Sequence, residues 1–284
     1  MYLKKIKQTD IGTLNRLPKF PKIKRKGEGG TRIKQKKLKK KNPLVSIITI
    51  TLNSEKYLED TIKSIQKQKM KNFEHIIIDG GSKDNTIDII KKHSKKISYW
   101  VSESDKGIYD AFNKGLLLAK GNYIGFVNSD DLLTKKSLYI LSKYIKKNPK
   151  LDFFFGSVKK HWGVLHGFKP WKIFFSLSFY TSHSTGFYIK KKSAQKLGFY
   201  NLNYRYLSDF DYLFRMIVHM KMKGIATKKN ELFGYFRRGG FSSNVKFKDH
   251  LLEDYNIRIN NKQNKFFVIF ITIYKIIKNF HRLR

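Results

Sequence analysis

Two acidic side chains stand side by side in the segment Asn128-Ser129-Asp130-Asp131, directly after the apolar run Tyr123–Val127. Adjacent carboxylates repel each other, and a divalent cation would relieve that repulsion. A hard ion such as Mg²⁺ or Mn²⁺ needs only one or two protein carboxylates when phosphate oxygens complete its coordination shell. The pair therefore predicts a metal site for a phosphate-bearing ligand, although an isolated Ser-Asp-Asp is also typical of a turn or a helix cap.

A second acidic loop, Asp79-Gly80-Gly81-Ser82-Lys83-Asp84, follows the run His75–Asp79. A phosphate-binding loop would not favour the two acids, Asp79 and Asp84, because their charges repel a phosphate. The glycines let the backbone approach a ligand, and Asp79 at a strand end could accept hydrogen bonds from a nucleobase edge or a ribose. The alternative is a tight turn in which Asp84 caps the following helix.

A third acid, Asp209, opens a predicted helix, with Asp211 two residues later. Acids at a helix N-terminus are favoured as caps and by the helix dipole. A carboxylate aimed into a crevice that already holds a metal would instead serve as general base for a hydroxyl group. His183 and the glycine-rich segment that begins at Arg238 add polar groups, and each of them taken alone is equally typical of a structural histidine or a loop.

The elements that must position these residues alternate between strand and helix from Pro43 onward. The patterns predict strands at 45–52, 75–79, 97–102, 123–127 and 153–158. They predict helices after Ser54 and at 86–93, 108–119, 136–147, 193–197 and 210–222. This alternation indicates an α/β fold with a mostly parallel central sheet covered by helices on both faces. Ligands of such sheets bind beyond the carboxyl ends of the strands, so the loops at 53–54, 80–84 and 128–131 are expected to converge on one crevice.

Composition limits the class of protein. The 284 residues include 60 Lys or Arg, 21 Asp or Glu and no cysteine, which excludes disulfide frameworks and cysteine-ligated metals. The excess charge of +39 is mostly lysine, whereas base-reading contacts favour the arginine fork, so a nucleic-acid partner is not expected. No apolar run reaches the ~18 residues of a membrane-spanning helix and no signal peptide is evident, so the expected location is the cytoplasm.

Five ordered segments together resemble the inverting family 2 glycosyltransferases of the GT-A fold, and in particular the branch that modifies bacterial cell-surface polysaccharides. The resemblance covers roughly residues 43–245. The segments that carry it are 46–53, 79–86, 105–115, 128–131 and 209–215.

The resemblance implies transfer of a sugar from a nucleoside diphosphate donor, with UDP as the expected carrier, to a hydroxyl of a glycan or lipid-linked acceptor. It implies Mn²⁺ or Mg²⁺ as cofactor. Residue by residue, Thr51 and Asn53 match the nucleotide contact, and Asp79 matches the acid that holds a uracil-type base.

Further matches complete the expected site. Asp130 matches the ribose contact, Asp131 the metal ligand and Asp209 the base that deprotonates the acceptor. Ser208 is a departure, because many members have an acid at this position. Segments on the donor side, or near the sugar and diphosphate, contribute Lys106, Asn113, Gly115, His183 and Arg238.

Three domains or segments are expected. Residues 1–42 carry 16 basic and 2 acidic side chains without an apolar stripe, which predicts a basic extended arm. Residues 43–245 form the GT-A domain. Residues 246–284 form an amphipathic helical segment whose apolar stretch 266–274 has basic neighbours, so it is expected either to lie on an anionic membrane surface or to pack on the domain or a partner.

Other functions remain open at this stage. A polyanion or nucleic-acid-binding protein would gather its positive charge in one groove with interleaved aromatic residues. A nucleotidyltransferase would need a triphosphate-binding loop, which is not found. A non-catalytic relative is disfavoured by the presence of Asp79, Asp130, Asp131 and Asp209 together.

Overall fold

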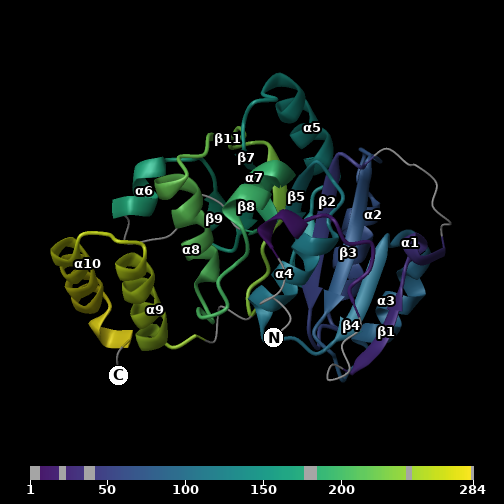
Figure 1. Ribbon diagram of the computed structural model, residues 1–284, viewed down its shortest axis with the longest axis horizontal. Helices are drawn as coiled ribbons and strands as arrows, with labels where there is room; N and C mark the ends of the chain where they lie inside the picture. The colour runs from purple at the N-terminus through teal and green to yellow at the C-terminus, as the bar shows by residue number, and fades with distance from the viewer. Residues whose placement is uncertain (1–6, 19–23, 35–41, 176–183, 241–244, 283–284) are drawn as a thin grey trace.

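A parallel four-stranded core organises the molecule (Figure 1). The computed structural model describes residues 7–18, 24–34, 42–175, 184–240 and 245–282. Four parallel strands lie in the order β4-β3-β2-β5. Their bounds are β2 Val45–Thr51, β3 Phe73–Asp79, β4 Tyr99–Glu103 and β5 Tyr123–Phe126. The predicted α/β fold with a mostly parallel central sheet is confirmed.

Alternation of side chains explains how the continuous apolar run of β2 is buried on both sides. Ile48 and Ile50 belong to the core cluster beneath α4, whereas Val45 and Ile47 belong to a cluster on the opposite face. Helix α4 therefore covers one face of the sheet. Helices α2 and α3 cover the other face, where Ile77 of β3 packs among their apolar residues. The bounds of these helices are α2 Leu58–Gln66, α3 Thr86–His93 and α4 Ile108–Leu118.

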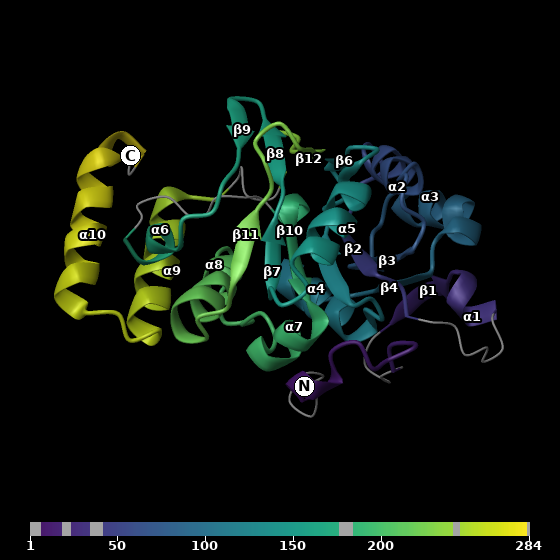
Figure 2. The same cartoon turned by 90° about the horizontal axis from the view of Figure 1, so that it is seen from above.

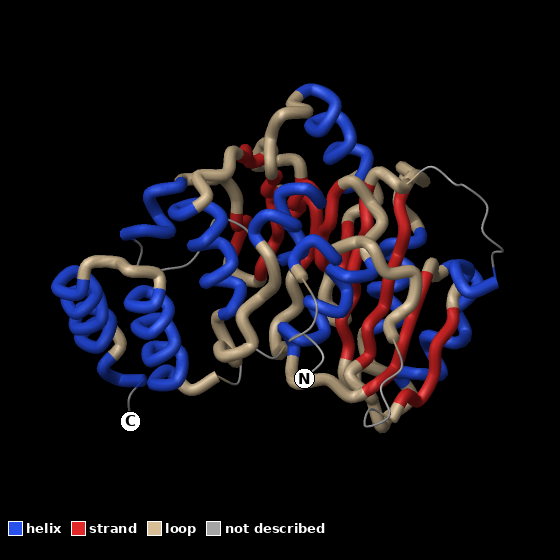
Figure 3. Tube along the Cα trace, in the orientation of Figure 1, coloured by secondary structure: helices blue, strands red, loops and turns tan. Residues whose placement is uncertain are grey.

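The second half of the chain extends this sheet and adds a smaller one (Figure 3). Strands β10, β7 and β11 continue the large sheet beyond β5, and a four-stranded sheet has the order β6-β12-β8-β9. The predicted strand 153–158 is divided between the two sheets at Gly156, where the Phe233 ring packs so closely that a side chain would clash. The strand bounds are β6 Leu132–Leu133, β7 Phe153–Phe155, β8 Ser157–Lys160, β9 Gly163–Leu165, β10 Phe187–Lys190, β11 Gly224–Ala226 and β12 Leu232–Tyr235.

Short helices connect these strands. The predicted helix 210–222 is an α-helix only up to Phe214 and continues as a wider π-helical turn over Arg215–His219. The other predicted helices form close to their expected bounds. The bounds of the other α-helices up to residue 214 are α1 Thr31–Lys34, α5 Ser137–Lys147, α6 Pro170–Phe175, α7 Lys191–Leu197 and α8 Ser208–Phe214.

The N-terminal region differs from the predicted basic extended arm, because its described residues belong to the domain. Strand β1 (Arg25–Gly29) pairs antiparallel with β4 at the edge of the large sheet. The Arg25 guanidinium contacts the buried Glu103 carboxylate at 2.7 Å, and Gly29 leaves room for the Trp100 ring. A local pattern does not reveal this placement, because several of the basic side chains pair with acids that are distant in sequence.

Glu28 in β1 is the centre of this attachment. Its carboxylate accepts hydrogen bonds from the Arg16 guanidinium at 2.7 Å and from the Tyr99 hydroxyl at 2.9 Å. Burial alone would raise the pKa of Glu28, but the hydrogen bonds from Arg16 and Tyr99 outweigh it and lower the pKa to about 2. The ionised form of Glu28 is therefore favoured by folding.

Glu28→Gln is expected to lower the free energy of unfolding by about 2–3 kcal/mol at neutral pH. Because the folded-state pKa is depressed, this contribution is present above about pH 4.5 and is lost as the pH falls towards about 2. Urea unfolding between pH 7 and pH 3 measures the difference. The native chain should lose more stability on acidification than Glu28→Gln does, with the exposed Asp88→Asn as control; parallel pH profiles for all three chains would contradict the assignment.

The C-terminal region forms two antiparallel helices, α9 (Phe247–Asn260) and α10 (Lys265–Lys278). Figures 1 and 2 both place α10 outermost, with α9 between it and the rest of the molecule. The Asp254 carboxylate of α9 contacts the ammonium of Lys275 at 2.7 Å and the guanidinium of Arg258 at 3.2 Å, all three buried. Over the described part of the chain, no helix combines the length and apolarity needed to cross a membrane.

Candidate active site

Three loops meet at the carboxyl ends of β2, β3 and β5, as the sequence predicts. The Asn53 backbone N–H donates to the Ser82 hydroxyl at 2.8 Å, and the Asn53 side-chain oxygen accepts from the Lys83 N–H at 2.8 Å. The hydroxyls of Ser54 and Ser129 lie 2.8 Å apart. Strands β3 and β5 are both parallel to β2 and lie on opposite sides of it, so the strand order reverses at β2. Open α/β sheets bind their ligands at such a point.

The Asp79 carboxylate is completely buried and is bonded within its own surroundings. One oxygen accepts from the N–H groups of Gly81 and Ser82 at 3.1 and 3.0 Å and from the Ser102 hydroxyl at 2.6 Å. The other oxygen accepts from the Ser82 hydroxyl. With four donors on its carboxylate and no exposed surface, Asp79 shapes the loop, and its predicted contact with a base has no support in this geometry.

Asp131 is a fully buried acid, and its Oδ2 accepts a hydrogen bond from the Thr185 hydroxyl at 2.7 Å. Burial raises the pKa of Asp131 to about 8, and the neighbouring Asp130 carboxylate adds to the shift. Burial also raises the pKa of Asp130. Both acids would thus be stabilised in their ionised forms by additional positive charge at this point.

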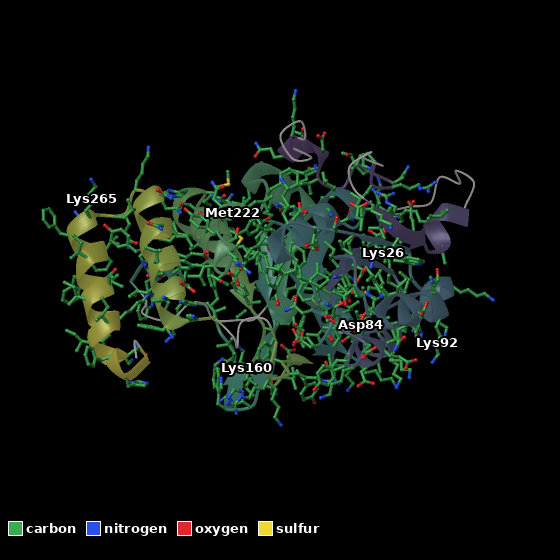
Figure 4. The ribbon with its side chains drawn as sticks, turned by 90° about the horizontal axis from the view of Figure 1, so that it is seen from below. Lys26, Asp84, Lys92, Lys160, Met222 and Lys265 are labelled. Carbon is green, nitrogen blue, oxygen red and sulfur yellow. The ribbon has the colours of Figure 1, made fainter. Side chains whose placement is uncertain are left out.

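Two cations from the second half of the chain supply part of that charge. Arg237 lies near Asp130 and Asp131, and its guanidinium contacts Asp60 at 2.9 Å. Lys160 of β8 (labelled in Figure 4) is close enough to Asp131 for charge attraction, and burial lowers the pKa of its ammonium. The Asp130 carboxylate itself lies only 2.5 Å from the position that a Cβ on Gly240 would take. Gly240, after β12, is therefore packed directly on Asp130.

The donor set at Asp130 and Asp131 suits a hard divalent ion. Carboxylate oxygens are the ligands such ions prefer, and Mg²⁺ and Mn²⁺ commonly take only one or two of them from the protein. Among the described residues no group of three or more His, Cys, Asp or Glu side chains is placed to hold a metal. A metal bound here would need to complete its shell from a ligand and water.

Asp209 lies at the start of α8 and is held by α4. Its Oδ1 accepts from the Phe210 N–H at 2.9 Å. It also lies 3.1 Å from the Tyr109 hydroxyl, whose single proton is shared with the Tyr206 carbonyl at 2.8 Å. Asp211 is different: it is buried, pairs with Arg215 at 2.8 Å and accepts from the Asn261 amide at 2.9 Å. Of the two acids, Asp209 is thus the one whose surroundings suit proton transfer, and Asp211 is structural.

Comparison with known proteins identifies the family. The model of glycosyl transferase family 2 matches residues 46–213, which contain all three converging loops and Asp209. The chain belongs to glycosyltransferase family 2. This transferase is 30% identical over 223 residues to a PGL/p-HBAD biosynthesis glycosyltransferase of Mycobacterium bovis, covering 74% of this chain and 83% of that protein. It is 29% identical over 248 residues to an uncharacterized glycosyltransferase of Methanocaldococcus jannaschii, covering 82% and 85%.

Solved structures share the fold of this glycosyltransferase. S. aureus TarS 1–349 in complex with UDP-GlcNAc aligns with a TM-score of 0.61 at 19% identity, covering 82% of this chain and 71% of that one. The chain spans 42% of the longer TarS structure. The mannosyltransferase PcManGT of Pyrobaculum calidifontis, in complex with GDP-Man and Mn²⁺, aligns with a TM-score of 0.59 at 15% identity, covering 83% and 70%. These likenesses confirm the predicted GT-A type of fold.

Two residues predicted to lie on the donor side of the glycosyltransferase, Asn113 and Gly115, belong to α4 and pack in the core. Asn113 is fully buried, and its amide exchanges two hydrogen bonds of 2.9 Å with the Tyr200 backbone. Gly115 packs directly on Ile48, so that a side chain there would clash. Both residues fix α4 in the core, because they lie on helix faces that point away from solvent.

The other predicted residues have varied surroundings. The Thr51 hydroxyl is buried and, among the described residues, has no hydrogen-bond partner. Lys106 and Arg238 are exposed. His183 lies outside the described residues. Their predicted roles toward the donor stay predictions.

Sequence reasoning missed several residues that support the site. Lys26 of β1, labelled in Figure 4, donates its ammonium to the carbonyls of Gly81 at 3.1 Å and Ser82 at 2.8 Å. Lys114 is buried and donates to the Ser104 carbonyl at 3.0 Å. Lys26 lies outside the segments that carry the family resemblance, whereas Lys114 lies within the segment 105–115, which could have drawn attention to it.

Proposed function

We propose that this chain transfers a sugar from a nucleoside diphosphate donor, with UDP as carrier, to an acceptor hydroxyl with inversion at the anomeric carbon. The observation that carries the proposal is the Asp130–Asp131 pair at the meeting point of the loops, with Asp131 buried, Asp130 half-buried, and Lys160 and Arg237 beside them. Paired acids with neighbouring cations suit a diphosphate bridged to a metal. The TarS complex with UDP-GlcNAc supports a UDP-linked donor, although the GDP-Man complex of PcManGT shows that the same fold accepts another carrier.

Mn²⁺ or Mg²⁺ would be held by Asp131, with Asp130 directed to the ribose. When bound, the ion neutralises charge on the departing nucleoside diphosphate. Lys160 and Arg237 would add positive charge on the protein side of the same leaving group. Thr185 keeps the Asp131 carboxylate oriented through the hydrogen bond to Oδ2.

The attacking hydroxyl requires a base on the opposite face of the sugar. Asp209 would accept the acceptor's proton as the new glycosidic bond forms and the bond to the diphosphate breaks. Single displacement inverts the anomeric configuration and needs no covalent intermediate with the enzyme. The Phe210 N–H, together with the proton that Tyr109 shares between Asp209 Oδ1 and the Tyr206 carbonyl, would hold the carboxylate in position.

The acceptor is proposed to be a glycan or lipid-linked glycan of the cell surface. The name of the mycobacterial relative, a PGL/p-HBAD biosynthesis glycosyltransferase, supports a role in surface glycan synthesis. The cytoplasmic location expected from the sequence stays a prediction.

Donor class can be tested before the acceptor is known. A panel of UDP-, GDP- and dTDP-sugars with Mn²⁺ or Mg²⁺ would be scored for binding by calorimetry and for slow hydrolysis of the donor. We expect metal-dependent binding and hydrolysis of a UDP-sugar. Absence of binding across the panel would contradict the proposed function.

The outer face of α10 supports a second proposal, attachment to an anionic membrane surface. One face of the helix packs on α9 through Val268, Ile271 and Lys275. The opposite face leaves large apolar side chains exposed, including Phe266 at 84% and Phe270 at 66%. The others on this face are Ile269, Ile273, Tyr274 and Ile277, and Phe280 is exposed just beyond the end of the helix.

Charge favours a lipid surface over another occupant. Basic side chains stand at both ends of the apolar face, beginning with Lys265 (Figure 4), and the whole chain carries +39. Each basic side chain near an anionic surface contributes about 1 kcal/mol, and aromatic side chains insert into the headgroup boundary. Because the buried Lys275–Asp254 ion pair holds α10 on α9, the apolar face would meet the lipid as a preformed surface.

Phe270→Gln combined with Ile277→Gln is expected to weaken binding to anionic vesicles at least ~10-fold, since each exposed apolar side chain would lose about 1.5 kcal/mol or more of burial in lipid. Vesicle flotation measures the effect, and Leu252→Gln, an exposed apolar residue of α9, is the matched control. Equal flotation of all three chains would exclude this face of α10 from binding. Lack of flotation by the native chain would refute membrane attachment.

A further inference from the structure

The sequence predicts Asp79 as the hydrogen-bond acceptor for the nucleobase of the donor, but in the structure the Asp79 carboxylate is not open to a ligand. All four hydrogen bonds to its carboxylate come from residues 81, 82 and 102, and the side chain has no exposed surface. Reaching a nucleobase would require the loop to give up several of these bonds. A different residue beside the same loop must therefore offer the open acceptor.

Asp105 occupies the space next to Asp79 that the missing side chain of Gly80 leaves empty. A Cβ on Gly80 would lie 2.6 Å from Asp105 Oδ2. Gly80 in turn donates its N–H to the Thr51 carbonyl at 2.9 Å, so the Asp105 carboxylate sits at the ends of both β2 and β3. This is the same position in the crevice at which the sequence predicted a contact with the base.

The two oxygens of Asp105 are not equivalent. Oδ1 accepts the Gly107 N–H at 2.9 Å, whereas among the described residues no hydrogen bond is made to Oδ2. The side chain is half-buried, so Oδ2 can still be reached by a ligand. Burial raises the pKa of Asp105, and the nearby Asp110 and Asp79 carboxylates add to the shift, so a donor to Oδ2 would stabilise the ionised form.

The segment that carries Asp105 is held firmly in place. The buried Lys114 ammonium donates to the Ser104 carbonyl at 3.0 Å and contacts Glu103 at 3.2 Å. The Lys106 N–H donates to the Asp110 carboxylate at 3.1 Å. A preorganised acceptor of this kind can discriminate between ligands that differ by one hydrogen-bonding group.

We propose that Asp105, through Oδ2, reads the nucleobase of the donor and selects uracil. Uracil presents a single acidic imide N–H between two carbonyls, which matches one open carboxylate oxygen. Guanine presents two adjacent donors that would need both carboxylate oxygens, and Oδ1 is already bonded to Gly107. The inference rests on the proposed function, since it names the base of that donor.

Asp105→Asn provides a test with a change of preference as its readout. Because the Gly107 N–H keeps the side-chain oxygen at the Oδ1 position, the amide NH₂ should take the place of Oδ2. The variant would then offer a donor where the native chain offers an acceptor. We expect affinity for UDP to fall roughly 10–100-fold, while the ratio of CDP to UDP affinity rises, because N3 of cytosine is an acceptor.

Gly80→Ala is the companion variant. Its Cβ would displace the Asp105 carboxylate without removing a polar group, and the Gly80 backbone is not in the left-handed region that glycine alone favours. It should likewise lose its preference for UDP. Titration calorimetry of UDP, CDP, GDP and ADP with Mn²⁺, together with thermal unfolding to verify folding, measures all three chains.

The outcomes separate the two proposals. If the native chain binds UDP most tightly and both variants lose this preference, the inference stands. Unchanged UDP and CDP affinities in folded Asp105→Asn would overturn it, and so would a native preference for GDP, ADP or CDP. If the native chain binds none of the four, the proposed function fails as well.

Discussion

Replacing Asp209 with asparagine is expected to lower the rate of sugar transfer roughly 10²–10⁴-fold while donor binding stays unchanged. The amide has the same shape and can still accept from Tyr109 and Phe210, which bond Oδ1 in the native chain. It cannot take the proton of an acceptor hydroxyl. The loss should therefore appear in the chemical step alone.

The measurement pairs calorimetry of UDP with transfer assays on the true acceptor. Asp88→Asn is the matched control, since Asp88 is an exposed acid of α3 that pairs with the neighbouring Lys91. The pH profile adds a second readout, because removal of the base should abolish the acidic limb of kcat. Transfer near the native rate in Asp209→Asn would place the base elsewhere. Asp211 would not be expected to act as the base instead, because its carboxylate is already bonded to Arg215 and Asn261.

Asp131→Asn is expected to abolish the metal dependence of donor binding and to reduce turnover roughly 10²–10³-fold, which corresponds to several kcal/mol of lost charge stabilisation. The fold should remain intact. Burial raises the pKa of Asp131 to about 8, so the metal-free native chain already favours a protonated carboxyl at neutral pH, and asparagine resembles that neutral form.

Two measurements separate a metal ligand from a structural acid. UDP titrations with and without Mn²⁺ should converge in Asp131→Asn and differ in the native chain and in Asp88→Asn. Thermal unfolding without metal should occur at the native temperature or higher, because a buried carboxylate that is costly to ionise has been removed. Retained metal-dependent binding would show that the acidic pair is only part of a turn.

The sequence by itself determined the alternating framework. The continuous β-branched run of β2 and the 3.6-residue periodicity of α2 are local properties. They predict a strand and a helix without knowledge of what each element packs against. Convergence of the loops after β2, β3 and β5 also followed, because parallel strands place their carboxyl ends at one edge. Asp131 and Asp209 are predicted site residues on the same basis, because Asp131 follows the end of a strand and Asp209 stands at the start of a helix.

Tertiary structure alone decided which side chains face the ligand. Asp79 and Asp105 are both acids that follow strands, but only the absence of a side chain at Gly80 and the four donors around Asp79 show which carboxylate has an open oxygen. In the sequence, Asn113 is equally suited to contact a ligand, but in the structure its amide is bonded to the Tyr200 backbone. Orientation of this kind depends on contacts between residues far apart in the chain.

Long-range charge pairing likewise explains why the N-terminal residues were misplaced. In the sequence, Arg25 is one basic residue among many, and nothing local distinguishes a solvated guanidinium from one that meets Glu103. The same holds for Lys160 and Arg237, which reach the acidic pair only because β8 and β12 belong to a second sheet. A local pattern records how one segment can be buried, whereas the partner of a charge is fixed only when the whole chain has folded.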